Sequence, residues 1–153
     1  MKESFFEIIE NESLTPDIYK MVLKGDTSEI TAAGQFVNIK LEGLYLRRPI
    51  SVCDKEKDLL TIIYKVVGKG TEQMKNMTSG KLNILSGLGN GYDTSLSGDK
   101  PLLIGGGVGV PPMYMLCKEL IKEGKKVSVI LGFIKKAKSF MRKSLPIWEP
   151  KSI

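Results

Sequence analysis

The sequence predicts an antiparallel Greek-key β-barrel of about six strands, followed by the beginning of an α/β domain with a parallel sheet. Two observations carry this prediction. Up to about residue 85, short strand-like segments alternate with turn signals, which is typical of barrels and sandwiches. Beyond Gly98-Asp99-Lys100-Pro101, two short apolar segments flank an amphipathic helix, which is typical of a βαβ unit.

The barrel prediction rests on segments with strand character. Residues 18–24 and 35–41 alternate in polarity, so each is expected to bury one face in a sheet. Residues 59–67 are rich in β-branched side chains, which favour strands. Residues 70–77 have helical character instead. The predicted strands are 4–10, 18–24, 35–41, 48–54, 59–67 and 81–85.

The α/β prediction rests on one helix between two strands. Residues 102–104 form a short buried-strand candidate, and residues 127–133 form the next. Pro111 and Pro112 are tolerated in a first helical turn, and Gly124 suits the end of the helix. One such unit cannot cover both faces of a parallel sheet, so this domain is expected to be incomplete. The apolar stripe of the helix consists of Met113, Leu116, Cys117, Leu120 and Ile121.

Composition narrows the chemistry. The chain contains no histidine, which excludes histidine acid–base catalysis and Ser-His-Asp or Cys-His triads. Cys53 and Cys117 have no cysteine or histidine neighbour at metal-ligand spacing, so no metal site built by this chain alone is expected. Both cysteines are expected to be buried, Cys117 on the helix stripe and Cys53 within the barrel. No catalytic side chain is predicted.

The net charge of +6 does not indicate nucleic-acid binding. Six basic residues lie after residue 133 against Glu149 alone, and the preceding body is close to neutral, without a basic stripe interleaved with aromatics. No apolar run approaches the roughly 18 residues of a transmembrane segment. The first residues lack the apolar stretch of a signal peptide, which predicts a cytoplasmic protein.

Arg48-Pro49-Ile50-Ser51 is the first candidate binding motif. Pro49 cannot donate to a strand ladder, so the segment is expected at a rim where side chains reach a ligand. The Arg48 guanidinium can hold a diphosphate through two parallel hydrogen bonds, and the Ser51 hydroxyl can bond a flavin ring nitrogen. The alternative is an exposed Arg-Arg pair beside a turn.

Gly68-Lys69-Gly70-Thr71 is the second motif, because it follows a strand and opens a helix. The free N–H groups at such a helix start favour a phosphate. The alternative is that Thr71 serves only as the N-cap of the helix.

The glycine run from Gly105 to Pro112 is the third and most specific motif. Gly107-Val108-Gly109, between a buried strand and an amphipathic helix, lets the main chain approach a pyrophosphate closely. Pro112 stands where the usual pattern has its third glycine, and the alternative is a glycine-rich connector. Leu88-Gly89-Asn90-Gly91-Tyr92 is equally consistent with a further site element and with a hairpin or linker. In this order, the three motifs indicate a flavin-dependent electron-transfer chain or a piece of one.

As a set, these motifs resemble the ferredoxin-reductase superfamily, in which a flavin-binding barrel precedes a nicotinamide-nucleotide domain. The resemblance is greatest to the electron-transfer subunits of NAD-linked (class 1B) dihydroorotate dehydrogenases, and it runs to about Phe133. In two departures, Ser86-Gly87 stands where those subunits have Gly-Pro, and Ile50 replaces the tyrosine of plant-type reductases. The matching segments are Arg47-Arg48-Pro49-Ile50-Ser51, Gly70-Thr71, Leu88-Gly89-Asn90-Gly91 and Gly105 to Pro112.

The resemblance implies an FAD-binding barrel over residues 1–97 and a partial NAD-binding α/β domain over residues 98–138. It implies electron transfer between NAD(H) and a dihydroorotate dehydrogenase catalytic subunit in pyrimidine biosynthesis, within a heterotetramer. The family continues with four cysteines that hold a [2Fe–2S] cluster, and they are not in this sequence. The implied FAD residues are Arg48, Pro49, Ile50, Ser51, Ile63, Tyr64, Lys65, Gly70 and Thr71, and the implied NAD residues are Gly105, Gly106, Gly107, Gly109 and Pro111.

Residues 139–153 do not resemble the family. Read one frame over, suitable codons for this segment encode a family-like stretch, and Trp148-Glu149 forces a glycine in that frame whatever codons are used. We therefore expect residues 139–153 to be a frameshifted or non-family tail, an expectation that the nucleotide sequence around and beyond this segment tests.

Two other functions fit the same motifs. One is a stand-alone or differently partnered flavin NAD(P)H reductase, in which Lys135 and Lys136 favour a 2′-phosphate. The other is a flavin-binding fragment without turnover. For the chain as it stands, we expect bound flavin with weak or absent reduction by NADH.

Overall fold

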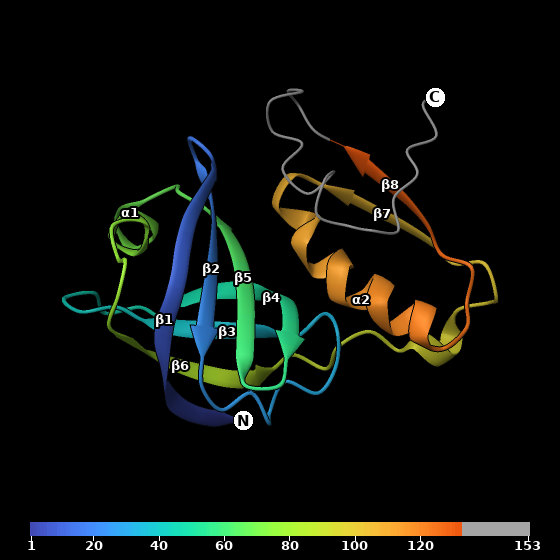
Figure 1. Ribbon diagram of the computed structural model, residues 1–153, viewed down its shortest axis with the longest axis horizontal. Coiled ribbons are helices and arrows are strands. Elements are labelled where there is room, and N and C mark those ends of the chain that lie inside the picture. Colours follow the sequence, from blue (N-terminus) through green and yellow to red (C-terminus); the bar gives the residue numbers. More distant parts are fainter. Residues whose placement is uncertain (133–153) are drawn as a thin grey trace.

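A closed antiparallel barrel of six strands forms the first part of the molecule in the computed structural model, which describes residues 1–132 (Figure 1). The strands lie in the order β1-β2-β5-β4-β3-β6. Consecutive strands β3, β4 and β5 are neighbours and β6 returns beside β3, which is a Greek key. All six predicted strands are confirmed. Their bounds are β1 (Lys2–Thr15), β2 (Ile18–Lys24), β3 (Phe36–Lys40), β4 (Arg48–Glu56), β5 (Leu59–Lys65) and β6 (Lys81–Leu88).

Strand β1 closes the barrel by pairing with two neighbours in turn. Its first half, Lys2 to Glu7, pairs with β6, and the half from Glu7 to Thr15 pairs with β2. Register shifts between Ile8 and Glu10 and between Ser13 and Thr15 bend the strand between these partners. The predicted strand 4–10 was too short, because the following polar residues lack an apolar period of two and are ordered by the β2 ladder.

The barrel interior is filled by the alternate apolar side chains of the strands, as the period of two predicts. Helix α1 (Lys69–Lys75) packs on this core through the fully buried Met74. The Asn11 amide of β1 donates to the carbonyls of Met74 (2.8 Å) and Met77 (2.9 Å), which satisfies groups at the end of α1. Side chains with no exposed surface include Phe6, Met21, Leu23, Val37, Ile39, Val52, Leu60, Ile62 and Ile84.

The second part of the described chain is the predicted βαβ unit. Strands β7 (Leu102–Gly106) and β8 (Ser128–Gly132) are parallel, and α2 (Pro111–Lys122) connects them and begins at a proline as expected. A short linker helix, η1 (Thr94–Leu96), precedes the unit, and the turn η2 (Gly107–Gly109) lies between β7 and α2. The sheet face away from α2 is largely exposed, as a single unit requires. Its apolar side chains are Leu102, Ile104 and Ile130.

Helix α2 lies against β4 and shares the barrel's core (Figure 1). Cys117, predicted on the buried stripe, is 2% exposed in this shared cluster. Two polar contacts fix the same helix. The Lys118 ammonium lies 2.9 Å from both Asp54 oxygens and 2.9 Å from a Glu56 oxygen, and Glu119 accepts from the Ala33 amide at 3.0 Å. The helix is therefore packed as part of the barrel rather than hinged to it.

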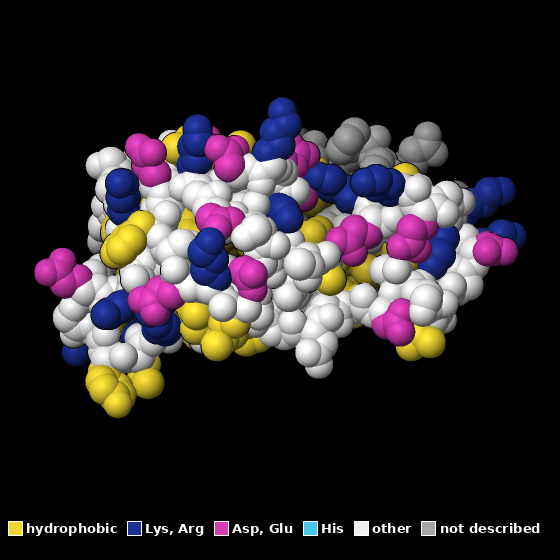
Figure 2. Space-filling view, turned by 90° about the horizontal axis from the view of Figure 1, so that it is seen from below, with side chains coloured by type: hydrophobic (Ala, Val, Ile, Leu, Met, Phe, Trp, Pro, Cys, Tyr) yellow, Lys and Arg dark blue, Asp and Glu magenta, His cyan; other side chains and the backbone are white. Residues whose placement is uncertain are grey.

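Charged side chains of both signs are interspersed on the face shown in Figure 2, over the barrel and the βαβ unit alike. Some lysines pair with neighbouring acids, as Lys20 does with Glu10 (3.0 Å) and Glu12 (2.9 Å). Exposed pairs of this kind contribute little stability, typically below about 1 kcal/mol. This face carries no continuous basic stripe.

A substitution at the interface tests whether the two parts share one core. We expect Leu120→Ala to lower the free energy of unfolding by about 2–5 kcal/mol, because it leaves a cavity between α2 and the barrel. The matched change Leu102→Ala, at a side chain 53% exposed, is expected to cost below about 1 kcal/mol. Urea unfolding followed by far-ultraviolet circular dichroism measures both. A transition in which the helix signal is lost while the barrel signal stays would contradict the shared core.

Candidate functional site

The ladder between β4 and β5 stops short of the start of β4 and the end of β5. These strands pair with each other only from Val52 and Ile62 onward. Residues 48–51 of β4 pair with β3, and residues 63–65 of β5 pair with β2. Among residues 1–132, no ladder joins 48–51 to 63–65, and we call this interruption of the ladder the β4–β5 seam. It brings the first predicted motif beside the predicted segment Ile63-Tyr64-Lys65 and leaves backbone groups there without a β4–β5 ladder partner.

The Arg48 side chain lies directly over Gly70, which joins the first and second motifs. A Cβ placed on Gly70 would lie 2.1 Å from Arg48 Nε, so the guanidinium occupies space that only glycine leaves free. Arg48 donates to the Leu46 carbonyl and has no carboxylate partner within the described chain. Arg47 is instead bound to Glu3 at 2.9 Å. Of the predicted Arg-Arg pair, Arg48 alone keeps its charge available to an anion.

Thr71 shapes the turn that carries Gly70. The N-cap of α1 is Gly68, so the suggestion that Thr71 is the N-cap is wrong. From the third helical position, the Thr71 hydroxyl accepts from the Val67 amide (2.9 Å) and the Gly68 amide (3.2 Å) and donates to the Gly68 carbonyl (3.1 Å). A hydroxyl so occupied fixes the turn, while the remaining first-turn amides have no helical acceptor.

The three predicted residues of β5 differ in orientation. Tyr64 is buried away from Arg48, where its hydroxyl donates to Asn11 Oδ1 at 3.0 Å. Burial raises the pKa of Tyr64 to about 12. Lys65 is exposed and faces Asp17 at 3.8 Å, whereas Ile63 packs towards the second unit. Of Tyr64, therefore, the backbone lies at the seam and the side chain does not.

The glycine-rich turn, the third motif, is held against the outside of the same seam. Val110, which follows η2, is 1% exposed and packs with Ile63 and Cys53. Gly105 permits this tight turn, because a Cβ there would lie 3.2 Å from the Val110 Cα. Gly107 has a φ of +55°, which favours glycine. Val110 is a positioning residue that sequence inspection missed, since it reads as part of a connector.

Cys53 is buried, but outside the barrel interior where it was expected. Successive side chains of a strand point to opposite faces, so Val52 faces the barrel and Cys53 faces Val110, and the register shift leaves Cys53 without a ladder partner in β5. Burial, with a smaller effect of Asp54, raises the pKa of the Cys53 thiol to about 12. The thiol is therefore neutral near pH 7 and serves as packing.

The Gly89–Tyr92 segment is a linker fixed to the barrel. Gln35, 6% exposed, accepts from the Thr31 amide at 2.7 Å and donates to the Gly89 carbonyl at 3.1 Å. The Tyr92 amide donates to the Ala33 carbonyl, and its ring lies where a Cβ on Gly34 would be. Gln35 was missed as an organising residue, because a glutamine opening a strand carries no distinctive signal.

Residues 1–132 contain no cluster of histidine, cysteine, aspartate or glutamate arranged to hold a metal ion. Across that same range, none of the helices has the length and apolar character needed to cross a membrane. Lys135, Lys136 and the tail 139–153, which entered the sequence predictions, lie outside the described residues.

We compared the chain with protein families, curated proteins and solved structures. No protein-family model matches the chain. It is 42% identical over 149 residues to "dihydroorotate dehydrogenase B (NAD(+)), electron transfer subunit" of Bacillus pumilus, and 44% identical over 149 residues to the protein of that name from Fusobacterium nucleatum. Each match covers 92% of this chain and 58% of the relative, so the chain spans a little over half the length of these proteins.

Solved structures share the fold. An NADH-dependent reduced ferredoxin–NADP oxidoreductase structure has a TM-score of 0.79 at 28% identity, covering 88% of this chain and 50% of that one. A ferredoxin NADP+ reductase from Neisseria gonorrhoeae, with bound FAD and NADP, has a TM-score of 0.81 at 17% identity, covering 95% and 63%. The predicted fold class is confirmed.

Thiol labelling tests how tightly the glycine-rich turn is held. In a Cys117→Ala background, we expect Cys53 to react with a disulfide reagent at pH 8 far more slowly in the native than in the unfolded chain. Val110→Ala should speed the reaction at least tenfold, because it uncovers the thiol. Val108→Ala is the control, since Val108 is 47% exposed. Equal acceleration by both changes would show that the turn is not seated through Val110.

Proposed function

The chain belongs to the dihydroorotate dehydrogenase electron transfer subunits, and we propose that it binds FAD at the β4–β5 seam, with NAD(H) docking at the glycine-rich turn. The observation that carries the proposal is the Arg48 guanidinium, without a carboxylate partner in residues 1–132, lying over the Cβ-free surface of Gly70. Two motifs more than twenty residues apart in sequence thereby form one anion site.

The residues at the seam fit the parts of FAD. Arg48 would hold the diphosphate, since a guanidinium presents two parallel donors to such a group. The backbone at Pro49, Ile50 and Tyr64 and the exposed Ser51 would meet the flavin ring, because this strand edge has no ladder partner. The remaining predicted residues would hold the site in shape. At the seam these are Ile63 and Lys65, and in the turn that opens α1 they are Gly70 and Thr71. When bound, flavin exchanges two electrons with a nicotinamide and one with an iron–sulfur centre.

The nicotinamide nucleotide would use the exposed backbone of the turn. Gly106, Gly107 and Gly109 are exposed, and Gly105 and Pro111 set the path into α2. Val110 seats this turn against Ile63 of the seam. In this proposal, residues 1–97 form the flavin-binding part, and residues 98–138 form the beginning of the nicotinamide-binding part.

For the whole protein, the proposed activity is electron transfer between NAD(H) and a dihydroorotate dehydrogenase catalytic subunit. The names of the relatives support this partner. A [2Fe–2S] cluster and a heterotetramer belong to the same proposal, with the cluster in sequence that this chain does not contain. No side chain need act as an acid or nucleophile, since the chemistry is the cofactor's.

Flavin binding is tested by removing each half of the anion site. We expect Arg48→Ala and Gly70→Ala each to weaken FAD binding about tenfold or more, one by losing the charge and the other by displacing it. FAD fluorescence quenching gives the dissociation constants. Arg47→Ala and Gly68→Ala are the controls, because Arg47 is bound to Glu3 and a Cβ on Gly68 meets nothing within 4 Å. Unchanged FAD binding in both test variants would contradict the proposed site.

Reduction by NADH tests the nicotinamide part. We expect FAD bound to this chain to bleach near 450 nm slowly or not at all with NADH under anaerobic conditions, while dithionite bleaches it fully. The physical reason is that a single βαβ unit presents one exposed sheet face and few groups for a nicotinamide. Rapid bleaching at low NADH concentration would show that this unit suffices.

A further inference from the structure

The residues at the seam would determine which way a bound FAD lies along β4. Ser51 and the β5 edge define the ring end, and Arg48 over Gly70 defines the diphosphate end. Along β4 these are three residues apart, or about 10 Å, comparable with the span from ring to diphosphate. The adenosine must therefore leave on the far side of Arg48, where the chain turns into the β3–β4 loop, residues 41–47.

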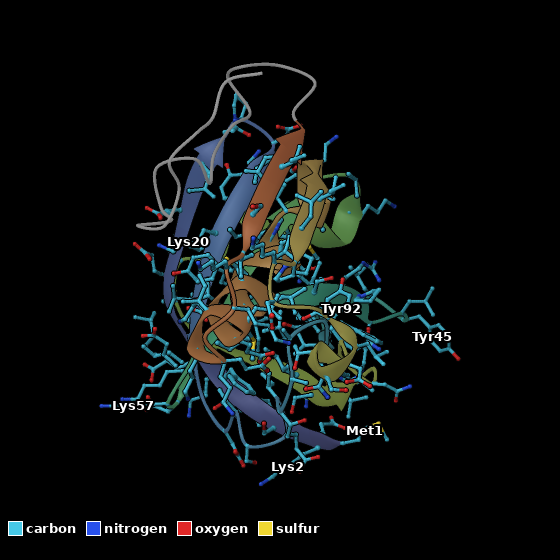
Figure 3. The ribbon with its side chains drawn as sticks, turned by 90° about the vertical axis from the view of Figure 1, so that its right-hand side faces the viewer. Met1, Lys2, Lys20, Tyr45, Lys57 and Tyr92 are labelled. Carbon is cyan, nitrogen blue, oxygen red and sulfur yellow. The ribbon has the colours of Figure 1, made fainter. Side chains whose placement is uncertain are left out.

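That loop presents two adjacent exposed apolar side chains at this place. Tyr45 is 100% exposed and Leu46 is 67% exposed. The Tyr45 ring projects clear of the barrel, so both of its faces are accessible (Figure 3). Single exposed apolar residues are common on proteins, but these two lie three and two residues before Arg48, and the Leu46 carbonyl accepts from the Arg48 guanidinium.

The loop is fixed at its base although its tip is exposed. Leu41 is 2% exposed, the Leu44 amide donates to the Leu41 carbonyl at 3.2 Å, and Leu44 packs against the barrel core. The Gln73 amide of α1 donates to the Glu42 carbonyl at 3.4 Å, which ties the loop to the helix that carries Gly70. A loop held in this way presents Tyr45 and Leu46 at limited entropic cost.

We propose that Tyr45 and Leu46 form the adenine platform of the flavin site and that they select FAD over FMN. This inference rests on the proposed flavin function. A purine ring stacks on an aromatic face and covers apolar side chains, and FMN ends at its phosphate, so it reaches Arg48 but not the platform.

The test compares two flavins on the same chain. Wild type is expected to bind FAD more tightly than FMN, and Tyr45→Ala and Leu46→Ala are each expected to weaken FAD binding about fivefold or more while FMN binding stays within about twofold. Tyr45→Phe should retain FAD binding, because it keeps the ring. Leu96→Ala is the matched control, since Leu96 is 83% exposed and lies on η1.

Each outcome has a distinct meaning. A selective loss of FAD affinity, restored by phenylalanine, supports the platform. Unchanged FAD affinity in both alanine variants overturns it and leaves the flavin site standing, as would be found if Tyr45 docked a protein partner instead. Equal loss for FAD and FMN also overturns it, because the residues would then act on the shared phosphate or ring. If wild type binds neither flavin, the proposed function fails and the platform fails with it.

Discussion

The register shift in β4 at Cys53 is the constraint on which the other features depend. Alternation along β4 turns Val52 into the barrel and Cys53 outward, and the extra residue at Cys53 has no ladder partner in β5. Val52 therefore completes the barrel core while Cys53 supports Val110, and Asp54 receives Lys118 from α2. On the other side of the shift, β4 and β5 separate and leave the seam open. This one local irregularity therefore lies between the contacts that hold the second unit and the strand edges of the proposed ligand site.

The proposed anion site balances the stability of the protein against the availability of the Arg48 charge to a ligand. A guanidinium paired to a carboxylate, as Arg47 is to Glu3, is already neutralised. Arg48 has only carbonyl acceptors within residues 1–132 and lies in a partly buried place over Gly70. Its charge therefore gains little from the protein itself and would gain more from a bound anion. Glycine at position 70 lowers the helix propensity of α1, which is a cost that the packing of Met74 offsets.

Local pattern was enough to predict the strands and α2, because alternation in 18–24 and the stripe through Cys117 are properties of neighbouring residues. Local pattern could not predict the contacts between segments that are distant in the sequence. The position of Arg48 over Gly70 and the seating of Val110 on Cys53 depend on barrel closure and on a register shift that leaves no mark in the sequence. The motifs named the components of the candidate site, and the fold alone decided which of their side chains face one another.

The pairing of β1 with β6 also has a consequence for how the chain folds. Lys2 is the ladder partner of Ser86, so the barrel cannot close until nearly all of it has been synthesised. Bringing such distant segments together costs on the order of 4 kcal/mol in chain entropy, which local turns do not repay until the last strand arrives. Topologies of this kind fold slowly compared with helical bundles. During translation the edge of β1 that pairs with β6 therefore stays unpaired, and the apolar side chains of β1 stay partly exposed, until β6 has left the ribosome.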